Sequence, residues 1–451
     1  MYKPLSIILP KKVVVFTVLV FLCSAIAADE TELVDSTFEA ISMIDEDIQG
    51  FSDAQSSYAE GMRLLENNQL EPALEKFNKA VEINNGYIDA WNAKANVLVQ
   101  LNRPEEALKN YDRALAIDPK STKALYNKAV TLLHLNRIDQ AYSTLDRVLE
   151  IEPLYEDAWI AKGVILERTS KLEPAFDAYS KATQINSHNT LALNKKGVVL
   201  IQLEKYEEAN SIFDAVLELD NANHLAWYNK GIALEKQSLF EQAIEPYIQS
   251  VELNPQFFDG WYHLGLAYYN TGMPDKALSA FERALELEPQ SVYAHFYRGN
   301  CLTDVERPED ALAVFQQVVT MEPRFVPGWY SLARVCDQLY LYEDALYAST
   351  RAVELQPQFA EAWSNRAVIL ANLNRFPEAV ESASRAVSIR PQKAMLWYNR
   401  ACVFAMNNNL DDALSDLKKA FELDSSYKEI AVDERVFEPL QKNSDFQKLV
   451  Q

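Results

Sequence analysis

Residues 258–291 have the sequence FDGWYHLGLAYYNTGMPDKALSAFERALELEPQS, and this stretch holds one copy of the pattern that decides the fold. Counted from Phe258, it has tryptophan at position 4, glycine at position 8, alanine at position 20 and proline at position 32. All the tryptophans of the chain are separated by multiples of 34 residues, and they are Trp91, Trp159, Trp227, Trp261, Trp329, Trp363 and Trp397. A fixed period of this length indicates tandem structural repeats.

Small residues fit the same register in eleven successive units, although the register was set by tryptophan alone. Position 8 is always Gly or Ala, and position 20 is always alanine. The alanines at position 20 are Ala73, Ala107, Ala141, Ala175, Ala209, Ala243, Ala277, Ala311, Ala345, Ala379 and Ala413. Two small residues at this separation mark the place where two helices cross at close range. We therefore predict that residues 54–427 form eleven helical hairpins.

Larger residues and prolines complete the prediction of an all-α fold. Position 24 is large and apolar in nine units, and seven units have proline at position 32. Proline there ends the second helix, because it has no N–H for the hydrogen-bond ladder. A lone hairpin leaves one apolar face uncovered, so stacking on neighbouring hairpins must supply most of the stability.

These positions resemble those of the tetratricopeptide repeat (TPR) family. The resemblance implies an α-solenoid, a right-handed superhelix of helical hairpins whose concave groove is lined mainly by the first helix of each unit. It also implies binding of proteins or peptides without catalysis. One departure is position 7, usually leucine in the family, which is basic here in Lys94, Lys128, Lys162, Lys196, Lys230, Arg298, Arg366 and Arg400. We expect these side chains to cover the adjoining helix while their charged ends reach solvent or nearby carboxylates.

The resemblance places positions 2, 5, 6, 9, 12 and 13 in the groove, and aromatic residues and asparagines recur at positions 5 and 6. The candidate binding residues are Tyr126, Asn127, Tyr228, Asn229, Tyr262, His263, Phe296, Tyr330, Asn365, Tyr398 and Asn399. Tyrosine offers a large contact area at small entropic cost, and an asparagine amide can pair with the backbone of an extended peptide. The alternative is that these residues stabilise the repeat and contact no ligand.

Composition and charge narrow the partners. The chain has 43 Lys plus Arg against 65 Asp plus Glu, a net charge of −22, which disfavours nucleic acid and anionic membrane surfaces. The histidines are His134, His188, His224, His263 and His295, and their spacing gives no metal site. No phosphate loop or nucleophile elbow is present. We therefore predict no catalytic, cofactor-binding or metal-binding residues and no enzyme activity.

The first 27 residues read as an export signal. Lys11 and Lys12 precede an apolar run, and Ala25 and Ala27 fit the pattern for cleavage after Ala27. The alternative is an uncleaved membrane anchor, which would be the chain's only contact with a membrane. Either reading predicts a secreted, cell-surface or otherwise extracytoplasmic location. The remaining cysteines, Cys301, Cys336 and Cys402, are too few for a disulfide framework, so we expect buried thiols.

Two segments flank the repeats. Residues 28–53 are acidic, and we expect a short helix or a solvated tether there. Residues 428–451 are expected to cap the last repeat, since a solenoid needs a polar outer end. The sequence thus predicts a non-catalytic scaffold or assembly factor that binds protein or peptide outside the cytoplasmic membrane. The alternative is an accessory subunit of a surface-polymer or secretion machine that holds a glycan or an enzyme.

Overall fold

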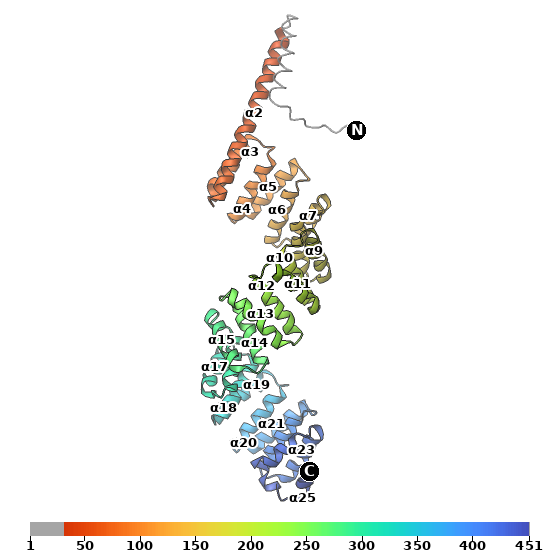
Figure 1. Cartoon of the computed structure of the whole chain (residues 1–451). Coiled ribbons are helices and arrows are strands. Elements are labelled where there is room, and N and C mark those ends of the chain that lie inside the picture. Colours follow the sequence, from red (N-terminus) through yellow and green to blue (C-terminus); the bar gives the residue numbers. More distant parts are fainter. Residues whose placement is uncertain (1–30, 451) are drawn as a thin grey trace. The chain divides into compact units, whose positions relative to one another are not determined.

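The computed structural model describes residues 31–450, with side chains from residue 49 onward. Within this range the chain forms α-helices and a single 3-10 helix, with no β-strand (Figure 1). The prediction of an all-α repeat fold is therefore confirmed. The predicted leader, residues 1–27, lies outside the described residues, and none of the helices described is long and apolar enough to cross a membrane.

Helices alternate strictly in length. The first hairpin consists of α2 (Thr31–Glu66) and α3 (Leu70–Ile83). The first helices of the later hairpins have 13 residues each and are α4 (Ile88–Gln100), α6 (Thr122–His134), α8 (Glu156–Arg168), α10 (Thr190–Gln202), α12 (His224–Lys236), α14 (Phe258–Asn270), α16 (Val292–Asp304), α18 (Val326–Gln338), α20 (Ala360–Asn372) and α22 (Ala394–Met406). The second helices have 14 residues each and are α5 (Pro104–Ile117), α7 (Ile138–Ile151), α9 (Leu172–Ile185), α11 (Tyr206–Leu219), α13 (Phe240–Leu253), α15 (Pro274–Leu287), α17 (Pro308–Met321), α19 (Tyr342–Leu355), α21 (Phe376–Ile389) and α23 (Leu410–Leu423).

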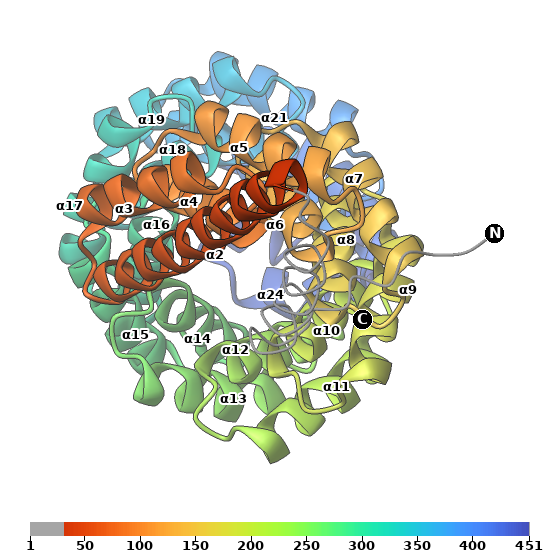
Figure 2. The same cartoon turned by 90° about the horizontal axis from the view of Figure 1, so that it is seen from above.

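The chain divides into two compact units, the first ending at Leu203 and the second beginning at Glu204. Within each unit, a second helix packs against the first helix of the next repeat. In the first unit α6, α8 and α10 lie inside α5, α7 and α9, and in the second unit α12, α14 and α16 lie inside α13, α15 and α17 (Figure 2). We call the surface formed by the even-numbered helices of a unit its inner face.

Five hairpins are held by a close contact between a glycine at position 8 and an aromatic ring at position 24. A Cβ atom added to Gly265 would lie 2.7 Å from Cε1 of Phe281, and one added to Gly231 would lie 2.5 Å from Cε1 of Tyr247. A ring therefore presses directly on the backbone of the first helix. Where position 8 is alanine, position 24 is usually smaller, as in the pair Ala129 and Leu145. The two positions share one volume in the core.

The turn inside each hairpin places position 15 in the left-handed region. These residues are Asn68, Asn102, Asn136, Ser170, Glu204, Ser238, Gly272, Glu306, Tyr340, Asn374 and Asn408, with φ between 56° and 71°. In the second repeat the Asn102 N–H donates to Val99 O at 3.0 Å and the Arg103 N–H donates to Leu98 O at 2.8 Å. This arrangement satisfies the last carbonyls of the helix, as in a Schellman-type ending.

The tryptophans anchor each first helix to the preceding loop. The indole Nε1–H of Trp261 donates to the carbonyl of Pro255 at 3.0 Å, and the other tryptophans make the same bond six residues back. His295 occupies this position in the eighth repeat, where its Nε2 lies 3.0 Å from the carbonyl of Pro289. Since a carbonyl only accepts, Nε2 carries the proton, and His295 replaces tryptophan as a structural donor.

The basic residues at position 7 behave largely as expected. Lys128 Nζ lies 2.6 Å from Asp112, and Lys162 Nζ lies 2.6 Å from Asp146. The Lys162 ammonium also lies 5.5 Å from the centroid of the Trp159 ring. These basic side chains therefore join one repeat to the carboxylate of the repeat before it.

Helix α13 contains Pro246, whose position inside the second helix predicts a kink or a frayed turn. The helix continues without interruption from Phe240 to Leu253, so the frayed turn is wrong. Pro246 is buried within the helix.

Three short helices follow the last hairpin: α24 (Tyr427–Asp433), the 3-10 helix η1 (Arg435–Leu440) and α25 (Ser444–Val450). Phe437, Leu440 and Phe446 are buried and belong to one apolar cluster with Leu417 of α23. They cover the apolar surface of the final hairpin. At the other end, the acidic residues from Thr31 onward belong to α2, so they continue the first repeat's helix instead of forming a separate short helix or tether.

The three cysteines of the described residues are free thiols, and Cys301 and Cys336 are buried as expected. Burial raises the pKa of the Cys301 thiol to about 12 and that of Cys336 to about 11. Both therefore stay protonated at neutral pH and act as small apolar residues.

Candidate binding surface on the inner face

The predicted aromatic residues at position 5 pack mostly on position 34 of the same repeat. Ring centroids are 5.2 Å apart for Tyr126 and Tyr155, 5.0 Å for Tyr228 and Phe257, 5.2 Å for Phe296 and Phe325, and 5.0 Å for Tyr330 and Phe359. Position 34 is the N-cap residue of the next repeat's first helix, and where it is Ser or Asn its side chain makes the capping hydrogen bond, as at Ser121, Asn189, Asn223 and Ser291. Part of each position 5 ring therefore stabilises its own repeat.

Tyr262 is the exception among these rings, because Ser291 caps the next helix at its position 34. The centroid of its ring instead lies 5.9 Å from those of Phe258 and Phe281 in its own repeat. It is also 5.5 Å from that of His263 and 6.3 Å from that of Tyr297. Tyr297 in turn lies 5.4 Å from Phe296. These contacts form an aromatic strip, which we define as Tyr228, Tyr262, His263, Phe296 and Tyr297.

Two of the predicted asparagines bond to neighbouring repeats. Asn127 Nδ2 donates to Asn92 Oδ1 at 3.1 Å, and Asn399 Nδ2 donates to Ser364 Oγ at 2.9 Å. Asn365 differs, because its buried Oδ1 has no hydrogen-bond partner. Asn229 is half-buried on α12. A continuous ladder of asparagines that grips a peptide backbone is therefore not formed.

Tyr398 lies on α22 but is only 6% exposed. Its ring is 5.0 Å from Tyr427 and 5.7 Å from Phe437 of the C-terminal helices. The sequence offered this tyrosine as a groove residue, yet the capping segment covers it. The exposed part of the second unit's inner face therefore excludes this ring.

A hydrogen-bonded carboxylate lies beneath the aromatic strip. Glu235 Oε2 is 2.9 Å from His263 Nδ1 and accepts from the Tyr247 hydroxyl at 2.7 Å. Burial opposes ionisation of Glu235, but the bonds from His263 and Tyr247 hold the pKa of its carboxyl below its usual value. Both bonds go to the same oxygen, Oε2, so this carboxylate links His263 of α14 to Tyr247 of α13.

A small polar notch lies on the inner face of the second unit, between α14, α16 and α18. Its volume is about 50 Å³, and Phe315 and Val335 add apolar walls. We define the notch by its polar residues, which are Tyr269, Asn300, Thr303, Asp304, Ser331 and Arg334. They occupy positions 6, 9, 12 and 13, whereas the predicted residues came only from positions 5 and 6. The missed signal was polarity at positions 9, 12 and 13, and at position 9 Asn300 and Arg334 stand in the second unit as Asn96 does in the first.

The charged side chains of this region form no ion pairs with other described residues, although the Arg334 guanidinium lies 5.9 Å from the centroid of the Tyr330 ring. Among the described residues, no ion pair within 4.0 Å includes Asp304, Arg334 or Asp337. Partial burial raises the pKa of Asp304, although Arg334 opposes the shift. Burial also raises the pKa of Asp337, against the effect of a hydrogen bond from Asn372.

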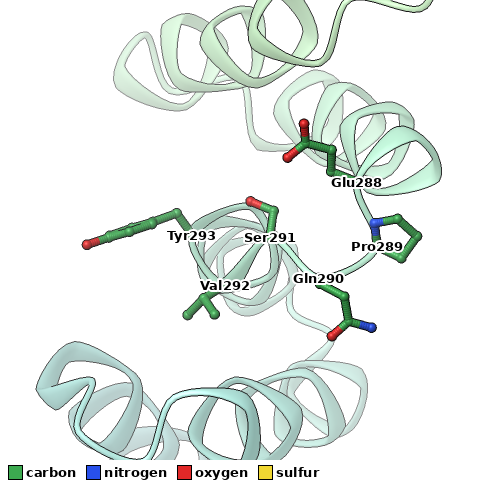
Figure 3. Close-up of a pocket in the computed structure, with 6 residues that line it drawn as sticks. All are labelled: Glu288, Pro289, Gln290, Ser291, Val292 and Tyr293. Atoms are coloured by element: carbon green, nitrogen blue, oxygen red, sulfur yellow. The ribbon is translucent and has the colours of Figure 1, made fainter. Parts of the chain in front are cut away.

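A shallow depression of about 520 Å³ lies at the loop between α15 and α16 (Figure 3). One continuous run lines it: Glu288, Pro289, Gln290, Ser291, Val292 and Tyr293. The Tyr293 ring points away from Glu288 and Pro289 and is 59% exposed. No set of polar groups converges here, so the depression suits an apolar contact better than a reaction. Among residues 49–450, whose side chains the structure describes, no cluster of metal-ligating side chains is present either.

Models of the tetratricopeptide repeat match residues 102–165, 191–223, 258–291 and 330–394, and a TPR repeat model matches residues 240–272. Three solved structures are similar to parts of the chain. YrrB, described as a TPR protein with an unusual peptide-binding site, is 26% identical over 41% of this chain and 95% of its own, with a TM-score of 0.37. MamA is 22% identical over 38% of this chain and 92% of its own, with a TM-score of 0.35. PilF of Pseudomonas aeruginosa is 20% identical over 47% and 96%, with a TM-score of 0.42. No curated protein matches the sequence.

Proposed function

We propose that this chain, which is a tetratricopeptide-repeat protein with multiple repeats, is a non-catalytic scaffold or assembly factor that binds an extended protein segment outside the cytoplasmic membrane. The observation that carries the proposal is the aromatic strip on the inner face of the second unit. Rings of this kind dominate the energy of protein interfaces, because they bury large area with few rotatable bonds.

The arrangement of the strip supports a ligand that lies along several repeats. Its rings come from α12, α14 and α16, and successive rings are within 6.3 Å of each other. The notch continues this surface, since the ring centroids of Tyr269 in the notch and Tyr297 in the strip are 5.7 Å apart. An extended segment could therefore place alternate apolar and polar side chains on one continuous surface.

Site-specific photocross-linking in intact cells tests the binding surface. A benzophenone amino acid replaces Tyr262 or Phe296 on the inner face, and Tyr347 on α19 is the matched control because it is a 62% exposed aromatic outside that face. We expect one protein partner to be joined at positions 262 and 296, at least about fivefold above position 347. Equal labelling at all three positions would contradict the proposal, and adducts containing glycan alone would favour the glycan-holding alternative.

The extracytoplasmic part of the proposal rests on the basic, apolar and small-residue pattern of residues 1–27. Mass spectrometry of the chain from its native cell tests it. We expect a mature N-terminus immediately after Ala27. A cytoplasmic chain that keeps residues 1–27 would contradict this part and leave the binding surface untouched.

A further inference from the structure

The notch is built by the stacking of three repeats. Tyr269 comes from α14, Asn300, Thr303 and Asp304 come from α16, and Ser331 and Arg334 come from α18. Its walls are therefore helical throughout and are fixed by the same packing that forms the second unit. A site on rigid helices holds its polar groups in a defined geometry without needing a loop to order.

Asp304 and Arg334 both line this space, yet they form no ion pair with each other or with any other described residue. The positive charge of Arg334 still acts on Asp304, because it lowers the pKa of Asp304 against the effect of burial. Elsewhere the chain brings opposite charges together, as in Arg400 and Asp416 at 2.6 Å. The notch thus holds a donor and an acceptor of opposite charge that lie more than 4.0 Å apart.

Neutral polar groups complete the lining. Thr303 Oγ1 donates to the carbonyl of Gly299 at 3.0 Å, and Ser331 Oγ donates to Asn300 Oδ1 at 3.5 Å. The NH₂ group of the Asn300 side chain can still donate hydrogen bonds to a ligand. A ligand in the notch therefore meets donors and acceptors together, with one full charge of each sign.

This lining discriminates among the side chains that a partner could insert. A carboxylate pairs with Arg334 but is repelled by Asp304 and leaves Asp304 without a donor, and an ammonium or guanidinium group pairs with Asp304 but is repelled by Arg334 and leaves Arg334 without an acceptor. An apolar group would leave the notch without hydrogen-bond partners, which costs about 1–3 kcal/mol for each buried polar group. A carboxamide satisfies both charges, because its oxygen accepts from Arg334 while its NH₂ donates to Asp304.

The size of the notch agrees with this chemistry. Its volume of about 50 Å³ is several times the roughly 10–15 Å³ that a cavity needs to hold one water, so it admits a small polar group. The aromatic strip next to it would hold the apolar residues on one side of that group. We propose that the notch binds the side-chain carboxamide of a glutamine or asparagine residue in the partner's extended segment.

The inference rests on the proposed function and is tested with the full chain and a random library of 12-residue peptides displayed on phage. We expect selected peptides to share a glutamine or asparagine beside aromatic or aliphatic residues. The best peptide is then synthesised with Gln, Glu, Lys or Met at that place. Replacing the carboxamide should weaken binding by at least about tenfold in each case, as measured by fluorescence anisotropy.

Two variants of the protein should change the order of affinities of the Gln, Glu and Lys peptides in opposite directions. Asp304→Asn removes the negative charge, so the Glu peptide should gain at least about tenfold relative to the Gln peptide. Arg334→Gln should produce the same gain for the Lys peptide. Asp275→Asn is the control, because this exposed carboxylate lies in the first turn of the outer helix α15, and it should leave the ranking unchanged.

The outcomes separate the two proposals. If Tyr262→Ala abolishes peptide binding but Asp304→Asn leaves the ranking unchanged, the carboxamide inference is overturned and the binding surface stands. If selected peptides share no carboxamide, the result is the same. If no peptide is bound, or if Tyr262→Ala leaves binding intact, the proposed function is contradicted. The carboxamide inference, which rests on it, is then contradicted as well. Circular dichroism of each variant shows that its fold is retained.

Discussion

The inner faces of the two units differ, although their hairpins are built on one plan. Position 6 is alanine at Ala59, Ala93 and Ala161 in the first unit, whereas it is His263 and Tyr297 in the second. The contact that closes a hairpin is the same in both, since Gly163 meets Tyr179 as closely as Gly231 meets Tyr247. The repeat therefore fixes positions 8, 20 and 24 for packing and leaves the inner positions free to vary with a ligand.

The same comparison extends to charge. In the first unit Glu167 accepts from the Tyr179 hydroxyl at 2.9 Å, and Lys195 Nζ lies 3.8 Å away from it. In the second unit the equivalent Glu235 has Tyr247 and His263 as partners. Replacing lysine by histidine adds a ring that joins the aromatic strip. The second unit thus gains aromatic area without giving up the partner of its buried carboxylate.

The largest effect should come from removing rings of the strip. We expect Tyr262→Ala to weaken binding of a selected peptide by about 30-fold or more, since a central aromatic residue at an interface is often worth 2 kcal/mol or more. Tyr126→Ala in the first unit should change this affinity less than threefold, because its ring stacks on Tyr155 and lies in the other unit. Fluorescence anisotropy measures both. Equal losses would remove the distinction between the two inner faces.

A second prediction concerns the shared volume at positions 8 and 24. Gly265→Ala places a methyl group 2.7 Å from a Phe281 ring atom, so we expect a loss of about 1–3 kcal/mol in unfolding free energy. The double variant Gly265→Ala with Phe281→Leu copies the Ala129 and Leu145 pair of the first unit. It should recover part of that loss, as measured by urea unfolding. A double variant whose loss is the sum of the two single losses would show that the positions are independent.

A third prediction uses pH. The folded-state pKa of Glu235 is below its usual value, so its stabilising contribution is present above the unfolded pKa of about 4.3 and is lost as pH falls through the folded value. Glu235→Gln should therefore cost about 1–2 kcal/mol at pH 7 and clearly less near pH 3. Glu167→Gln in the first unit is the matched variant, with a smaller expected cost because its lysine is farther away. Thermal unfolding at both pH values checks this, and a cost for Glu235→Gln that is unchanged by pH would contradict it.

The sequence revealed the hairpins because their contacts use residue types at a fixed spacing. It did not reveal that position 5 rings pack on position 34, since Phe257 and Tyr155 precede the next helix and read as loop residues. The notch could not be predicted from the sequence for a different reason. Tyr269, Asn300 and Arg334 are about one repeat apart in sequence, and each is an isolated polar residue until the helices stack. Tyr398 fits the binding pattern locally, and only the C-terminal helices determine that it is covered.

The smallest effect concerns the turns. Asn136 of the first unit, like Asn374 and Asn408 of the second, is a residue type that tolerates positive φ, whereas Tyr340 of the second unit has φ 60°. Tyr340 is 77% exposed, so its side chain adds little packing to offset the strain. We expect Tyr340→Gly to raise the unfolding free energy by about 1 kcal/mol, because glycine adopts this conformation without a steric penalty. Asn136→Gly should change it by less than about 0.5 kcal/mol, and urea unfolding of both variants checks the difference. A Tyr340→Gly variant that is less stable than the parent would mean that the exposed ring stabilises the turn more than its backbone conformation strains it.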